Sequence, residues 1–349
     1  MPASEEERTR PRPVVVTPDG PKQPDRVSVV ICAYTAGRWD DTLAAVDSVR
    51  GQSVPAEEII VVVDHNPALW RRLRTALPDV TVRQSQGQPG LSGAKNTGIA
   101  ASRGDILAFL DDGAVAEADW LKYLADAYRD PSVAGVGGLT LPRWQDARPP
   151  WFPPELDWVV GCTYAGMPRH RAAVRNLHGG NASFRREAFA VAGDFRSGIG
   201  RSAGGPRSGC EDTEFCIRLL RRMPGARLLF DDRAVIWHQV PRARARFRYL
   251  TARCYAEGQS KALVTRHAGL GDGLSRERGY AARTLPAGVR RCIADVVAGD
   301  LAGLGRAGAI VAGLTAATAG YTVGATREFA AGVLTDKTRA LAAAWRPEC

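Results

Sequence analysis

The 349-residue sequence lacks both glycine motifs that most often hold nucleotide phosphates. After its first apolar run, at residues 27–34, the chain continues as ICAYTAGRWD without a GxGxxG, which excludes a dinucleotide-binding fold. No GxxxxGK followed by Ser or Thr occurs, which excludes a P-loop protein. A nucleotide ligand would therefore have to be held by carboxylates and loop backbone.

Paired cysteines are also missing. The seven cysteines form no CxxC pair and show no metal-ligand spacing; they stand at positions 32, 162, 210, 216, 254, 292 and 349. This scattered, odd set argues for reduced thiols, so we expect a cytoplasmic protein. Residues 1–26 begin MPASEEERTRPRP and contain no apolar signal core, and we expect them to be disordered.

Basic residues are concentrated late in the chain. The net charge is +10, and residues 242–291 hold 12 Lys and Arg against 3 Asp and Glu. Such a stretch meets phosphates, anionic lipid or nucleic acid, or forms a solvated helical surface. Because no recognisable nucleic-acid-reading module accompanies it, we expect no nucleic acid partner.

Charge is absent from residues 307–325, which are mostly Ala, Gly and Thr. Their length is sufficient to cross a bilayer, but their weak hydropathy favours a small-residue helical hairpin packed on the protein or on a membrane. We expect residues 241–349 to form a basic helical C-terminal extension. Its anticipated partner is an anionic membrane surface, with peripheral association on the inner face of the cell membrane.

Apolar runs and amphipathic segments alternate through the first 140 residues. Strands are predicted at 27–34, 58–64, 80–85, 105–112 and 133–138, with helices at 40–52, 67–78, 90–102 and 117–130. This order predicts an α/β fold with a mostly parallel sheet flanked by helices. Ligands of such sheets bind beyond the carboxyl ends of the strands, where Asp64, Asp111 and Asp112 stand.

Five segments in order resemble family 2 glycosyltransferases, inverting enzymes with the GT-A fold, as found in bacteria. They read VSVVICAY, EIIVVVD, GLSGAKNTGIAAS with DILAFLDD, GGNASFRREAF and CEDTEFCIRL. The resemblance covers roughly residues 27–240 and implies a nucleotide-binding half, 27–140, and an acceptor half, 141–240. It implies transfer of a hexose-type sugar from a nucleotide-diphosphate donor, which we expect to be a UDP-sugar. The acceptor hydroxyl would belong to a glycan, a lipid-linked saccharide or a small molecule.

The resemblance assigns several residues to the donor. Asp64 would hold the base, although DHNP stands where the family usually has Asp-Asp-Gly-Ser; the alternative is a cap on the following helix. Tyr34 and Thr35 would contact base and ribose, or belong to a plain loop. Lys95 and Asn96 begin a helix whose counterparts touch ribose or phosphate, and the alternative for Lys95 is a surface lysine.

Two further segments carry donor candidates. Gly180 and Asn181 belong to GGN, where absent side chains suit close approach of the backbone to a sugar. Arg242 begins a run in which arginine recurs at every second position up to 248. In an extended segment one face would carry all of them, and one or two would clamp the diphosphate.

The acidic motif reads FLDDGAV, at residues 109–115, where the family usually has Asp-x-Asp. A divalent cation, Mn²⁺ or Mg²⁺, takes about six ligands, several of which diphosphate and water supply. Asp111 would hold ribose or metal, and Asp112 would partly replace the carboxylate missing at Gly113. His238, which ends a later apolar run, is a second metal ligand by family likeness, or a structural histidine.

The catalytic candidates lie in CEDTEF. The resemblance assigns Asp212 as the general base that removes the acceptor proton, and Glu211 as the residue that orients acceptor or base. The alternative is a helix-capping pair. A sugar-nucleotide-binding protein with impaired catalysis is the competing function, because DHNP and Gly113 depart from the family pattern. The glycine-rich segment 196–209 is either a lid or an ordinary flexible loop.

Overall fold

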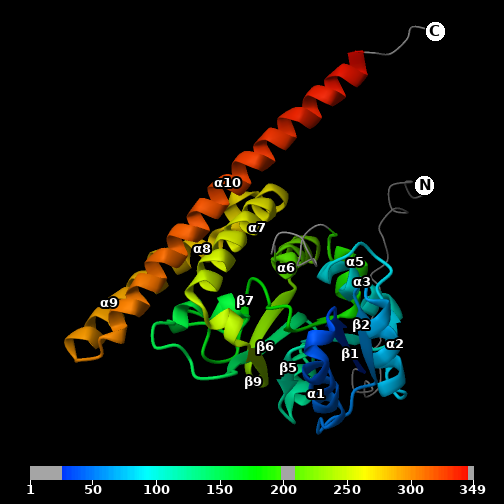
Figure 1. Ribbon diagram of the computed structural model, residues 1–349. Coiled ribbons are helices and arrows are strands. Elements are labelled where there is room, and N and C mark those ends of the chain that lie inside the picture. Colours follow the sequence, from blue (N-terminus) through cyan, green and yellow to red (C-terminus); the bar gives the residue numbers. More distant parts are fainter. Residues whose placement is uncertain (1–25, 198–208, 345–349) are drawn as a thin grey trace, which may run out of the picture.

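The computed structural model describes residues 26–197 and 209–344, and its elements are labelled in Figure 1. The expected disordered N-terminal segment, except for Arg26, and most of the glycine-rich segment 196–209 lie outside the described residues.

One nine-stranded sheet forms the centre of the fold. Its first four neighbours are parallel, as expected for the nucleotide-binding half: β3 (Thr81–Gln84), β2 (Glu58–Val63), β1 (Val27–Ala33) and β4 (Ile106–Asp111). The order continues through β8 (Asn181–Arg185), β6 (Val133–Trp144), β9 (Arg227–Val240) and β5 (Ala114–Ala116), with β7 (Ala172–Val174) also paired to β9. The sheet is therefore mixed, since β8, β5 and β7 pair antiparallel to their neighbours.

Helices cover both faces of this sheet and make a three-layer α/β fold. One apolar core joins the sheet to α1 (Trp39–Arg50), α2 (Pro67–Ala76) and α4 (Trp120–Ala127). The core of the other face joins it to α3 (Leu91–Ala101), α5 (Arg186–Ala192) and α6 (Glu211–Arg222). Strands β1, β2 and β4 are buried on both faces because their Val, Ile and Leu side chains meet a helix layer on each side.

The C-terminal extension is helical, as expected, but residues 307–325 are not a hairpin. After the short helix η4 (Arg242–Ala245), it consists of α7 (Phe247–Gly273), α8 (Ser275–Gly279), η5 (Tyr280–Thr284), α9 (Leu285–Val297) and the single long helix α10 (Ala302–Ala344). Figure 1 shows α10 running along α7 and extending past the sheet domain.

Glycines bring α7 and α10 into close contact. A Cβ on Gly258 would lie 2.0 Å from the carbonyl oxygen of Ala317, and one on Gly320 would lie 2.0 Å from that of Tyr255. A third apolar core includes residues of η3 (Pro154–Val160), β9, α7 and α10. The extension therefore packs firmly on the second half of the sheet domain.

Candidate active site

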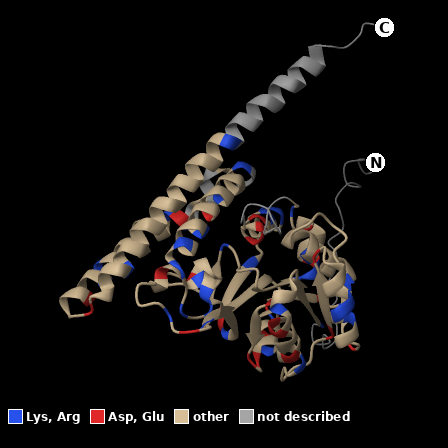
Figure 2. Ribbon diagram, viewed as in Figure 1, with Lys and Arg blue, Asp and Glu red and all other residues tan. Residues whose placement is uncertain are grey.

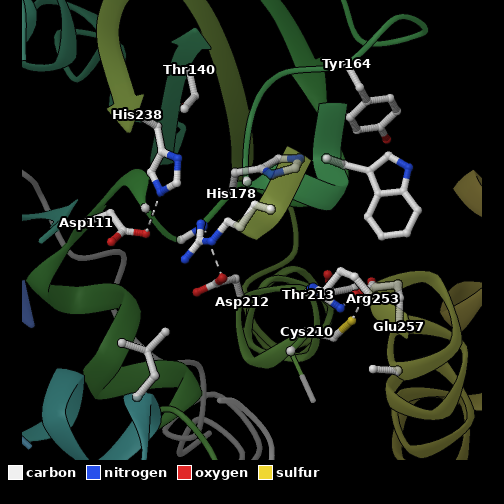
Figure 3. A pocket seen from close by; sticks show the side chains of 18 of the residues that line it. Asp111, Thr140, Tyr164, His178, Cys210, Asp212, Thr213, His238, Arg253 and Glu257 are labelled. Atoms are coloured by element: carbon white, nitrogen blue, oxygen red, sulfur yellow. Dashed lines mark hydrogen bonds and ion pairs between the residues drawn. The ribbon is translucent and has the colours of Figure 1, made fainter. Parts of the chain in front are cut away.

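The carboxyl ends of β1, β2 and β4 border an open cavity of ≈ 1980 Å³. Most residues predicted from the sequence line it: Tyr34, Thr35, Asp64, Lys95, Asp111, Asp112, Gly180, Glu211, Asp212 and His238. In Figure 3, Asp212 lies between the Asp111–His238 pair on one side and the Arg253–Glu257 pair on the other.

Arg38 joins the two carboxylates of the acidic motif. Its Nη1 lies 3.4 Å from Oδ1 of Asp111 and also contacts Asp112. A Cβ on Gly113 would lie 3.5 Å from the same Nη1. The guanidinium therefore reaches the place toward which a third side chain would point. Arg38 was not predicted from the sequence, because nothing in TAGRWD marks it as a partner of the distant carboxylates.

The two carboxylates have opposite protonation tendencies. Burial, followed by the charge of Asp111, raises the pKa of Asp112 to about 8, although Arg38 opposes this change. For Asp111 burial acts in the same direction, but His238 and Arg38 outweigh it and hold the pKa well below its ordinary value. Asp111 is thus the charged member of the pair, and it is also the more exposed one.

Asp111 and His238 offer two possible metal-ligand side chains to the cavity. Nε2 of His238 lies 3.5 Å from Oδ2 of Asp111. Among residues 26–197 and 209–344, no group of three His, Cys, Asp or Glu side chains could hold a metal ion. In the same part of the chain, the buried Oδ2 of Asp112 and Nδ1 of His238 have no hydrogen-bond partner. Because unpaired buried polar atoms are rare, this corner retains unused ligand capacity. Its carboxylate and imidazole donors suit a divalent cation that also takes oxygens from a diphosphate.

Lys95 forms a buried ion pair with both catalytic candidates. Its Nζ lies 2.5 Å from Oδ1 of Asp212 and 3.2 Å from Oε1 of Glu211. Burial would lower the pKa of Lys95, but Asp212 and Glu211 outweigh it and raise this pKa. Burial and the charge of Asp212 raise the pKa of Glu211. Lys95 is only 2% exposed, so the surface-lysine alternative is wrong.

Gly179 holds the other oxygen of Asp212. Its backbone N–H donates to Oδ2 over 3.0 Å, and a Cβ at this position would lie 2.1 Å from that oxygen. The first glycine of GGN therefore allows close approach to a carboxylate of this protein, whereas the sequence suggested approach to a sugar. Asp212 does not cap α6, so the capping alternative is not supported for this residue.

Asp64 lines the cavity at the end of β2. Oδ2 accepts the backbone N–H of Gly90 over 2.9 Å, and Oδ1 lies 2.7 Å from Nδ1 of His65. The cap of α2 is Asn66, whose side chain accepts the N–H of Leu69. The helix-cap alternative for Asp64 is therefore wrong.

Tyr34 and Thr35 follow β1 at the rim of the cavity. Tyr34 is exposed, with the guanidinium of Arg38 5.9 Å from its ring centroid. The Thr35 hydroxyl accepts the N–H of Gly37 and caps η2 (Ala36–Arg38). Tyr34 thus offers an open aromatic surface, while Thr35 also shapes the loop.

Two asparagines predicted to bind the donor do not line the cavity. Asn96 donates to the carbonyl of Phe195 and accepts its N–H, over 2.8 and 3.0 Å. Asn181 is fully buried; it accepts from the indole of Trp120 and donates to the carbonyls of Leu139 and Ala234. Their amides hold the protein together, and we withdraw both from the donor-binding set.

The arginine run after β9 is not extended. Residues 242–245 form η4, so the expected alternating face does not exist. Arg242 lies outside the cavity lining and forms an ion pair with Asp146, which corrects its prediction as a diphosphate clamp. Arg244, Arg246 and Arg248 line the cavity instead. Within the described part of the chain, their guanidinium groups form no ion pair or hydrogen bond.

The far wall of the cavity comes from the C-terminal extension. Glu257 forms an ion pair with Arg253 and accepts from the thiol of Cys210, both over 2.9 Å. Lys261 lies 2.7 Å from Glu277. Burial would raise the pKa of Glu257, but Arg253 and Lys261 lower it to about 2. Several charges of the basic stretch are therefore buried and paired, and they tie α7 to the residue that precedes Glu211.

Comparisons with known proteins agree with this geometry. Residues 28–192 match the model of glycosyl transferase family 2. A glucosyl-dolichyl phosphate glucuronosyltransferase of Haloferax volcanii is 32% identical over 243 residues, 68% of this chain and 77% of that protein. The succinoglycan biosynthesis protein ExoM of Rhizobium meliloti is 26% identical over 249 residues, 69% and 75% of the two chains.

A solved structure shares the fold. It is the mannosyltransferase PcManGT from Pyrobaculum calidifontis in complex with GDP-Man and Mn²⁺. The TM-score is 0.54 at 19% identity, and the match covers 89% of this chain and 90% of that one.

Proposed function

Because the chain belongs to glycosyl transferase family 2 and is a glycosyltransferase, we propose that it transfers a hexose-type sugar, with inversion, from a nucleotide-diphosphate donor. We take UDP-sugars as the first donors and a hydroxyl as the acceptor. One observation carries the proposal: Asp64, Asp111 and His238 line the same cavity as Asp212.

In this proposal Asp64 and Tyr34 hold the base, and Arg244, Arg246 and Arg248 supply the clamp first expected of Arg242. Asp111 and His238 would hold a divalent cation, which when bound would supply positive charge near the departing diphosphate. Charged Asp111 suits this role better than Asp112, whose raised pKa and contact with Arg38 favour a supporting role.

Asp212 acts as the general base. The acceptor oxygen attacks the anomeric carbon, the bond from that carbon to the diphosphate oxygen breaks, and the electron pair leaves with the diphosphate. The acceptor proton passes to Asp212, whose oxygens keep lone pairs beside those used by Lys95 and Gly179. Lys95 and Gly179 hold the Asp212 carboxylate in place, each through one of its two oxygens.

The acceptor class is suggested by likeness. The name of the Haloferax volcanii relative specifies glucosyl-dolichyl phosphate, a lipid-linked sugar. We therefore place lipid-linked saccharides first among the acceptors and propose action at the cytoplasmic face of a membrane.

The test combines binding and turnover. Wild-type protein is titrated by calorimetry with UDP and with GDP, each with and without Mn²⁺, and nucleoside diphosphate release is measured over a panel of donor sugars. Asp212→Asn should keep nucleotide binding and lose about 10²–10⁴-fold in turnover. His238→Ala should remove the Mn²⁺ dependence of binding.

Asp126→Asn, outside the cavity lining, is the control and should behave as wild type. Turnover of Asp212→Asn within about tenfold of wild type would show that another group takes the proton. Absence of binding by UDP and GDP under every condition would refute these donors.

A further inference from the structure

Exposed apolar side chains gather on one part of the described structure. Six of its ten exposed large hydrophobic residues lie in α9, in the first half of α10 or, for Leu301, in the turn between them: Ile293, Val297, Leu301, Leu304, Val311 and Leu314. We call these six residues the α9–α10 surface. Large apolar side chains that are exposed together on one part of a protein often mark an interaction site.

The outward face of α10 continues this surface without charge. Between Arg306 and Arg327 the helix has no charged residue, and Figure 2 shows it almost entirely tan over this length. Its exposed threonines satisfy their hydroxyls within the helix: Thr315 donates to the carbonyl of Val311, Thr318 to Leu314 and Thr322 to Thr318, over 2.9, 2.9 and 3.0 Å. Because these hydroxyls are already hydrogen-bonded, moving this face from water into an apolar environment costs little free energy.

The opposite face of α10 cannot meet lipid. It packs through Gly320 and Gly324 against α7, which carries the buried charges of Arg253, Glu257 and Lys261. Residues 302–327 are long and apolar enough to cross a membrane, yet crossing would require α7 to separate from α10 or to enter with its charges. The arrangement favours a helix that lies on a membrane.

The catalytic cavity reaches this face. Leu314 and Thr318 line the cavity and are also exposed, Leu314 by 41%. The lining also includes Ala317, Tyr280 and Trp158, and the indole of Trp158 donates to the hydroxyl of Tyr280 over 3.1 Å. Leu314 and Thr318 therefore belong both to the uncharged face of α10 and to the cavity lining, and we call this place the mouth.

Positive charge stands beside the apolar residues. Arg290, Ile293 and Val297 follow the i, i+3, i+7 spacing of one face of α9, and all three are exposed. Arg283 is exposed one turn before α9. In the described structure, neither arginine has an acidic partner. An exposed helix face that combines arginine with large apolar side chains matches an anionic membrane surface.

We propose that the α9–α10 surface rests on an anionic lipid bilayer and that the mouth at Leu314 and Thr318 admits an amphiphilic acceptor from it. The apolar chain of the acceptor stays at the bilayer and its hydroxyl reaches Asp212. The acceptor part of this inference rests on the proposed function, whereas the membrane contact does not.

The surface is tested by sedimentation of the full chain with phosphatidylcholine vesicles, with and without phosphatidylglycerol. Wild-type protein should bind the anionic vesicles, and Val311→Glu should bind at least about tenfold more weakly. Val54→Glu is the matched control, because Val54 is also exposed, 40% against 57% for Val311, but belongs to the loop before β2. It should bind as wild type.

Three results would refute the proposal that the α9–α10 surface binds an anionic bilayer. They are absence of binding to anionic vesicles, equal effects of the two glutamates, and a dimer in light scattering that Val311→Glu dissociates while vesicles are not bound. The last would assign the surface to a second copy of the chain.

The mouth is tested with alkyl glucosides of increasing chain length, below their micelle concentrations, in calorimetry on the nucleotide-loaded protein. Wild-type affinity should rise by up to about fourfold per added CH₂. Thr318→Trp should abolish this rise, and Thr322→Trp, exposed on the same helix but outside the cavity lining, should preserve it.

Equal behaviour of the two tryptophan variants, or no chain-length dependence in wild type, would refute the entry route. Failure of nucleotide to bind is detected in the loading step and would refute the proposed function instead.

Discussion

Replacement of Lys95 by methionine removes the buried cation that the carboxylates of Glu211 and Asp212 share. Nζ of Lys95 lies 2.5 and 3.2 Å from Asp212 and Glu211, and its side chain is 3% exposed. Removing one partner of a buried ion pair costs about 3–5 kcal/mol, because the remaining charge is left without compensation. We expect Lys95→Met to lower the free energy of unfolding by that amount.

The pH dependence of this loss follows from the carboxylates. The pKa of Glu211 is already raised above its ordinary 4.5, and without Lys95 it should rise further. A pKa that is raised in the folded state means that protonation of Glu211 stabilises the fold. This contribution to the free energy of unfolding is complete below pH 4.5 and is lost as the pH rises through the pKa of the folded state. The loss of unfolding free energy in Lys95→Met, relative to wild type, should therefore become smaller as the pH falls toward 4.5. Lys95, whose own pKa is raised, stays charged throughout this window.

Urea unfolding at several pH values measures the effect. Lys122→Met is the control, because Lys122 forms a 3.9 Å pair with Asp119 in which both side chains are nearly half exposed. Such a pair contributes about 0–1 kcal/mol. If Lys95→Met lost no more than the control, or if its deficit grew on acidification, the ion pair would not have the role assigned to it.

Two other predictions concern the cavity walls. Gly179→Ala should lower turnover by about 10²-fold with nucleotide binding retained, because the new Cβ would lie 2.1 Å from Oδ2 of Asp212; unchanged turnover in the donor assay would contradict the close approach. Glu257→Gln should make the free energy of unfolding fall less steeply as the pH is lowered. The pKa of Glu257 is lowered from 4.5 to about 2, so its contribution to stability, up to about 3 kcal/mol, is lost between those pH values in the wild type. An unchanged slope in acid titration of unfolding would show that Glu257 is not stabilised by Arg253 and Lys261.

The sequence predicted the part of the fold that depends on local pattern. Strands β1, β2 and β4 are buried on both faces and appear as continuous apolar runs, so their ends, with Asp64 and Asp111, could be located. Strands β5, β7 and β8 have only three to five residues and carry no such run. The antiparallel pairings of the mixed sheet were therefore not predicted.

The chemistry of the site was predicted less well than its location. Arg38 contacts Asp111 from 73 positions away, and Lys95 contacts Glu211 from 116 positions away, so no local pattern relates these partners. Asn96 and Asn181 belong to family-like motifs, yet their amides are used inside the protein. A motif marks which residues are constrained, whereas only the three-dimensional contacts show whether the constraint serves a ligand or the fold.

The two walls of the cavity are made at different times during synthesis of the chain. Every candidate from Tyr34 to His238 precedes α7, whereas the opposite wall of the cavity extends to Tyr321 in α10. A growing or truncated chain that ends after β9 contains Asp64, Asp111 and Asp212 but lacks the three arginines proposed to clamp the diphosphate and the wall formed by α7 and α10. Under the proposed function, such a fragment could neither clamp the donor diphosphate nor enclose the acceptor. The proposed transfer would therefore become possible only after α7 and α10 have been made.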